Sequence, residues 1–168
     1  MLSPISPLSK FFHLQQFTNV LVPHMNPVTM AQALLAARRI KKKIWPAHGE
    51  ALFWSGQGVN GSVQADALQY AHKHGLMILS QALTRAHINI PPIDCNLYSN
   101  RLWEFASATY ARLAEGVVYA IVGEKRLGSI WEDIELPLLI KNSRVQRVVE
   151  IDVRSQPAKK TTVHEKVA

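Results

Sequence analysis

The stretch VVYAIVG, residues 117–123, is the clearest signal of a buried strand in this chain, because it is apolar almost without interruption. An amphipathic helix is predicted directly before it, over residues 101–116. Further strands are predicted over 51–54 (ALFW), 76–79 (LMIL) and 145–153 (VQRVVEIDV). Because helical segments separate these strands, we expect an α/β fold with a short, largely parallel sheet flanked by helices.

The N-terminal part is predicted to be helical. Asn26 is a suitable N-cap and Pro27 a suitable first helical residue for the basic helix that follows. Residues 1–25 have the prolines and mixed polarity of an irregular lead-in. The predicted organisation is a lead-in with a basic helix packing on the domain (1–47), an α/β domain (48–153) and a flexible tail (154–168).

The net charge of +7 lies in the flanks of the 168-residue chain. Residues 1–47 hold six Lys or Arg and no acid, whereas residues 48–153 hold nine against eleven acids. The basic cluster RRIKKK at 38–43 has the charge to touch phosphates, but a charge run on one helix is usually a solvated face, so nucleic acid is an unlikely partner.

No apolar stretch reaches the roughly 18 residues of a membrane span. With Cys95 as the only cysteine, no intrachain disulfide forms, and a cytosolic environment is the simpler expectation.

Two familiar kinds of site, a dinucleotide-binding turn and a histidine metal site, are only weakly indicated. The stretch GQGVNG at 56–61 matches G-x-G-x-x-G, but no acid follows in a well-placed second strand, so a flexible loop is the preferred interpretation. His72 and His74 are two residues apart on a predicted helix and point to different faces. We therefore predict no metal site and no bound cofactor.

Aromatic and acidic residues gather where the predicted strands end. Trp54 ends a strand, Trp103 and Ser107 lie one helical turn apart, and the acidic run 132–135 follows a strand and a turn. Ligands bind at such edges of α/β sheets, and two indoles with a carboxylate can hold a flat cationic group. Core tryptophans and a solvated acidic turn are the more common explanation of the same residue types.

Three segments, LFWSG, LWEFASATYARLAEGVVYAIVG and LGSIWEDIELPLL, resemble in order and spacing the ADP-ribosyl cyclase / NAD glycohydrolase family. The resemblance spans roughly 51–153 and is greatest to the cysteine-poor microbial branch, which includes toxin-like domains that destroy NAD. It implies an enzyme that releases nicotinamide from NAD through an oxocarbenium-like ribosyl intermediate, with NAD as substrate. An inhibitory protein partner is also implied, as is a location in the cytoplasm or, for a secreted effector, in a target cytosol.

The resemblance also assigns a catalytic carboxylate. Glu135 would hold the ribose diol and stabilise the oxocarbenium ion. The Gly128-Ser129 turn would approach the phosphates through its backbone. Anchoring the comparison at this turn favours Glu132 instead as the catalytic acid.

The remaining substrate contacts are implied in the same way. Trp54 and Trp103 would be paired rings against the nicotinamide and the purine. Ser55 would lie near the phosphates and Ser107 near the reacting ribose.

One segment departs from the family pattern. Where the family has T-L-E, often followed by another acid, this chain has ILSQ, with Ser80 and Gln81 in place of carboxylates. The amide of Gln81 can hydrogen-bond the nicotinamide but carries no charge. The alternative function is therefore a catalytically impaired nucleotide- or acidic-partner-binding protein with the same fold.

Overall fold

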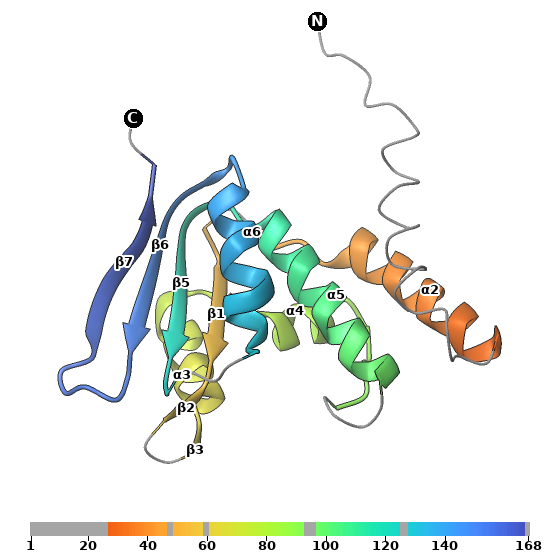
Figure 1. Ribbon diagram of the computed structural model, residues 1–168, viewed down its shortest axis with the longest axis horizontal. Coiled ribbons are helices and arrows are strands. Elements are labelled where there is room, and N and C mark those ends of the chain that lie inside the picture. Colours follow the sequence, from red (N-terminus) through yellow and green to blue (C-terminus); the bar gives the residue numbers. More distant parts are fainter. Residues whose placement is uncertain (1–26, 47–48, 59–60, 93–96, 125–127, 167–168) are drawn as a thin grey trace, which may run out of the picture.

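The centre of the molecule is a five-stranded sheet of order β4-β1-β5-β6-β7 (Figure 1). The computed structural model describes residues 27–46, 49–58, 61–92, 97–124 and 128–166, so the predicted lead-in, Asn26 and Cys95 lie outside it. The first four strands are parallel and the last pair is antiparallel. The strands are β1 (Ala51–Ser55), β4 (Met77–Ile78), β5 (Gly116–Val122), β6 (Val145–Asp152) and β7 (Lys159–Glu165).

Helices cover both faces of the sheet, which confirms the predicted α/β class and the helical N-terminal part. Helix α3 lies on one face, and α4, α5 and the π-helix η1 with α6 lie on the other (Figure 1). A short hairpin, β2 (Gln57–Gly58) with β3 (Gly61–Ser62), follows β1. The helices are α2 (Pro27–Lys43), α3 (Gln64–His74), α4 (Leu79–Arg85), α5 (Leu97–Leu113), η1 (Trp131–Glu135) and α6 (Leu136–Lys141).

Successive side chains of each strand point to opposite faces of the sheet, and this produces two hydrophobic clusters. Leu52 and Ile121 pack with α3 in the smaller cluster, whereas Phe53 and Ala120 belong to the larger cluster beneath α5 and α6. A strand that is buried on both faces has no polar face, which is why residues 117–123 are apolar throughout.

Helix α2 packs against α5. Ile40 and Ile44 are buried in the larger cluster, whereas the five basic residues between 38 and 43 are all exposed. The basic run therefore forms the solvated face of a helix whose other face is part of the core.

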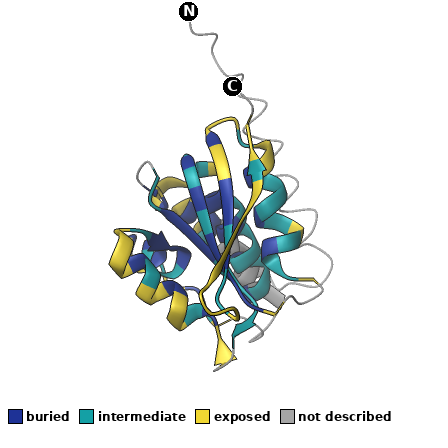
Figure 2. Ribbon diagram, turned by 90° about the vertical axis from the view of Figure 1, so that its left-hand side faces the viewer, coloured by how far each residue is buried: buried dark blue, intermediate teal, exposed yellow. Residues whose placement is uncertain are grey.

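The C-terminal segment differs from the sequence prediction. Residues 159–165 are not a flexible tail but form β7, which pairs antiparallel with β6 at the edge of the sheet. The strand is exposed along most of its length (Figure 2), so main-chain hydrogen bonds rather than apolar burial hold it in place. A polar edge strand lacks the alternation by which strands are recognised, and for this reason the prediction was wrong.

Two backbone segments cross in direct contact where β1 and β5 end. The Gly123 amide donates to the Ser55 carbonyl at 2.9 Å, and the Glu124 amide donates to the Gln57 carbonyl at 2.7 Å. A Cβ on Gly123 would lie 2.1 Å from the Gln57 oxygen. Gly56 has φ 93°, and its Cβ would lie 2.4 Å from the Glu124 oxygen. Both glycines are therefore required by the close approach of two main chains.

Because of this crossing, we expect two Gly→Ala changes to lower the free energy of unfolding by different amounts. Gly123→Ala places a methyl group against backbone atoms, which cannot move aside, so we expect a loss of about 2–3 kcal/mol of unfolding free energy. Gly58→Ala is the matched control, because the nearest atom to its Cβ is Val63 Cγ1 at 3.4 Å. Urea unfolding of both variants measures the difference. Equal losses would contradict the crossing.

Candidate active site

The candidate site lies at the edge where the parallel strands end. Trp54 and Ser55 complete β1 beside Ile121 and Val122 of β5. The π-helix η1 begins a few residues after β5 and lies against both α5 and β1. This is the edge at which open α/β sheets bind ligands.

Glu135 is the buried acid of this region. It ends η1, is 6% exposed, and accepts a hydrogen bond from the side chain of Ser107 in α5, which is 4% exposed. Burial raises the pKa of Glu135 to about 7, and the hydrogen bond from Ser107 lowers the pKa against this trend. At neutral pH the carboxyl group is therefore divided between its neutral and its charged form.

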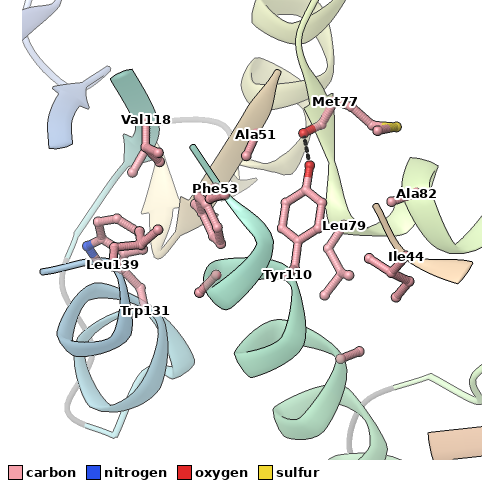
Figure 3. Close-up of a cluster of buried hydrophobic side chains, with 14 of the residues drawn as sticks. Ile44, Ala51, Phe53, Met77, Leu79, Ala82, Tyr110, Val118, Trp131 and Leu139 are labelled. Carbon is pink, nitrogen blue, oxygen red and sulfur yellow. Dashed lines mark hydrogen bonds between the residues drawn. The ribbon is translucent and has the colours of Figure 1, made fainter. Parts of the chain in front are cut away.

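Trp131 anchors the beginning of η1. Its indole is 2% exposed and donates a hydrogen bond from Nε1 to Glu150 Oε1 at 2.9 Å. The ring centroid lies 5.6 Å from that of Phe53 in β1 (Figure 3). From this anchor the π-helical turn leads to Glu135, and such turns occur frequently at functional sites.

Tyr110 anchors α5 as Trp131 anchors η1, through a hydrogen bond and a ring contact with Phe53. It is fully buried, its hydroxyl donates to the Met77 carbonyl, and its ring centroid lies 5.2 Å from that of Phe53 (Figure 3). Burial, and to a smaller extent the charge of Glu135, raise the pKa of Tyr110. Since Tyr110 lies three residues after Ser107, its anchoring fixes the face of α5 that meets Glu135.

The sequence interpretation gave no role to Trp131, Glu150 or Tyr110. A tryptophan between apolar and acidic residues was the available signal for Trp131. Its bond to Glu150 joins residues 19 positions apart and requires the fold to be known.

Trp54 and Trp103 pack against different hydrophobic clusters. Trp54 is half-buried against the α3 cluster, and Trp103 is half-buried against the cluster on the other face of the sheet. Trp103 also donates from Nε1 to the Pro91 carbonyl at 2.8 Å. Ser55 follows Trp54 on β1 and is half-buried.

Two of the predicted substrate contacts cap their own helices. Gln81 Oε1 accepts the Ile78 amide at 3.0 Å, at the start of α4. Ser129 Oγ accepts the Glu132 amide at 3.2 Å, at the start of the η1 segment. Gly128 is exposed with φ 75°.

The two candidate acids occupy different environments. Glu132, the alternative catalytic acid, is half-buried one turn before Glu135. Glu135 is the acid that the structure places beside Ser107.

Two further features concern only the part of the chain that the structure describes. No group of three or more His, Cys, Asp or Glu residues there is arranged to hold a metal ion, and His72 and His74 are exposed on α3. No helix in the described ranges is both long enough and apolar enough to span a membrane.

Comparison with known proteins finds similarity in structure alone. No protein-family model matches the sequence, and neither does any curated protein. The structure is similar to CD38, with a TM-score of 0.50 and 17% identity over 81% of this chain and 72% of CD38. It also matches the Aplysia cyclase complexed with substrate NGD and product cGDPR, with a TM-score of 0.49 and 21% identity over 71% of this chain. An ADP ribosyl cyclase complexed with N1-cIDPR matches with a TM-score of 0.48 and 23% identity over 62% of this chain.

The likeness to CD38 shows a shared fold. The present chain spans 64% of the length of the Aplysia cyclase and 49% of that of the ADP ribosyl cyclase.

The environment of Glu135 predicts a pH dependence of stability. Because its pKa is about 7 when folded and about 4.5 when unfolded, the folded protein keeps a proton that the unfolded chain has released. The free energy of unfolding therefore falls as the pH rises from about 4.5 to 7. Glu135→Gln lacks this contribution, so its stability relative to the wild type should increase by roughly 3 kcal/mol across that range. Urea unfolding at several pH values measures this, and parallel curves for the two proteins would contradict it.

Proposed function

We propose that this protein cleaves the bond between nicotinamide and ribose in NAD, as an NAD glycohydrolase or ADP-ribosyl cyclase. The observation that carries the proposal is the buried Glu135 beside Ser107, at the ligand-binding edge of a fold shared with CD38. The order of the three sequence segments described above supports the same family. NAD is the substrate, and the proposal requires no separate cofactor.

A single buried carboxylate can promote this reaction. When the bond from ribose C1′ breaks, its electron pair stays on the pyridinium nitrogen, so nicotinamide leaves as a neutral molecule without needing a general acid. The ribosyl group becomes a cationic oxocarbenium ion. Water then adds to C1′ and loses a proton in hydrolysis, whereas a nitrogen of the adenine attacks C1′ in cyclisation.

Glu135 would stabilise the positive charge that develops at the ribose. A carboxylate in a buried site acts on a nearby cation more strongly than one in water, because the surroundings screen it less. The same burial raises its pKa to about 7, so a substantial fraction remains ionised at neutral pH. Its position beside Ser107 supports Glu135 over Glu132 as the catalytic acid.

The other assigned residues would bind the substrate from the surrounding elements. Trp103, one helical turn before Ser107 on α5, would contact one aromatic end of NAD. Trp54, which packs against the cluster on the other face of the sheet, would contact the other aromatic end. Gly128, Ser129, Ser55 and Gln81 stay predictions for the phosphates and the nicotinamide amide.

A second candidate is a nucleotide- or acidic-partner-binding protein that has lost turnover. The observation that favours it is Gln81, which carries no charge and whose amide oxygen is already hydrogen-bonded to the Ile78 amide.

For an active NAD glycohydrolase or cyclase, the biological role implied by the resemblance is that of an NAD-depleting toxin of the microbial branch. Such a toxin would act as an effector in a target cytosol and meet an inhibitory partner in its host.

Nicotinamide release from NAD tests the proposal. Glu135→Gln should lower kcat by roughly 10²–10³-fold, because the amide cannot stabilise the oxocarbenium ion. Glu132→Gln is the matched control and should stay within a few-fold of the wild type. A wild-type protein that releases nicotinamide with unchanged kcat in Glu135→Gln would refute the assignment. Absence of release by the folded wild type would favour the binding protein instead.

A further inference from the structure

A second candidate site lies at the opposite end of the sheet. A pocket of about 400 Å³ opens where α2 and α4 both end, with Lys43, Trp45, Arg85 and His87 around it and Met77 and Ala82 in its wall. Met77 is the first residue of β4 and pairs with Ala51, the first residue of β1. The pocket is therefore at the amino ends of these strands, away from Ser55 and Glu135. Its volume is within the range of small-molecule sites.

An exposed indole marks this pocket. Trp45 is 61% exposed, whereas Trp131 is 2% exposed and the other two tryptophans are half-buried. The preceding residue, Ile44, is 1% exposed and anchors the chain in the core, as Figure 3 shows beside Ala82. The indole is thus presented to solvent from a fixed backbone, which suits stacking on a planar ring.

The lysine and the arginine that line the pocket carry positive charge. Lys43 and Arg85 are exposed, and none of the described residues lining the pocket is acidic. The helix C-termini here contribute roughly half a negative charge each at most, so the two full positive charges exceed them. Arg39, one turn before Lys43 on α2, is also exposed and extends the positive surface.

His87 adopts a backbone conformation that normally favours glycine. Its φ is 55°, and it follows α4 with its amide donating to the Thr84 carbonyl, while the Ile88 amide donates to the Leu83 carbonyl. Glycine is the usual residue at such a helix end because a side chain is disfavoured in the left-handed region. The imidazole is thus held beside the pocket at a cost in backbone energy, as occurs at functional sites.

We propose that this pocket binds a nucleoside phosphate, with the base stacked on Trp45 and the phosphate held by Lys43, Arg85 and His87. A flat ring joined to an anion is the chemistry that matches an exposed indole next to clustered cations. The ligand is either a free nucleotide or one nucleotide of a single strand whose next phosphates would follow the basic face of α2. The site is independent of Glu135 and of NAD cleavage.

Titration of the full-length protein with AMP, followed by calorimetry, tests this proposal. Trp45→Ala and Arg85→Gln should each weaken AMP binding tenfold or more, and Trp45→Phe should retain most of it. Lys73→Gln, which removes one exposed charge from α3 on the other face of the sheet, is the control and should stay within twofold. Glu135→Gln should also leave this binding unchanged, which separates the pocket from the proposed active site.

His87→Gly gives a second readout. It should weaken AMP binding and, at the same time, move the urea midpoint of unfolding upward, because glycine fits the left-handed conformation better. A purely structural histidine would show the gain in stability without the loss of binding.

A six-nucleotide oligoadenylate distinguishes the two sources of the ligand. Affinity similar to that of AMP indicates a free nucleotide, whereas affinity at least tenfold higher that falls steeply with salt indicates a single strand. The proposal is overturned if the folded wild type binds neither probe. It is equally overturned if the Trp45 and Arg85 variants bind both probes as well as the wild type does.

Discussion

The contact of Phe53 with Tyr110 and Trp131 is the interaction on which the candidate site depends. Phe53 belongs to the central part of the sheet, and the two rings that contact it come from α5 and η1. The hydroxyl of Tyr110 and the indole N–H of Trp131 each reach a fixed partner, so neither element can rotate without losing a hydrogen bond. With α5 and η1 fixed, Ser107 meets Glu135, and the chemistry of the site follows from that contact.

Much of this arrangement could be predicted from the sequence, where burial leaves a pattern. Strand β5 and helix α5 were predicted within a few residues, because a strand buried on both faces and an amphipathic helix have distinct periodicities. Strand β7 was missed because it is polar and exposed. The caps formed by Gln81 and Ser129 were also missed, since a side-chain bond to a neighbouring amide leaves no periodic signal.

The pairing of Glu135 with Ser107 brings together two consequences of burial. A charged carboxylate is costly in the core, and this cost raises its pKa to about 7 and makes the folded protein less stable as the pH rises. The same poorly screened environment gives the ionised form its strength against a developing cation. Under the proposed function, stability and catalysis would make opposite demands on this residue, as is common in active sites.

The pH dependence of nicotinamide release, compared between the wild type and Ser107→Ala, tests the central claim most directly. The account predicts a wild-type rate that rises with pH through about 7, as Glu135 ionises, and a midpoint that moves upward when the Ser107 hydrogen bond is removed. Thr109→Val, which deletes another buried hydroxyl of α5, should leave the midpoint in place. A rate independent of pH between about 5.5 and 8.5, or a midpoint unchanged in Ser107→Ala, would contradict the account.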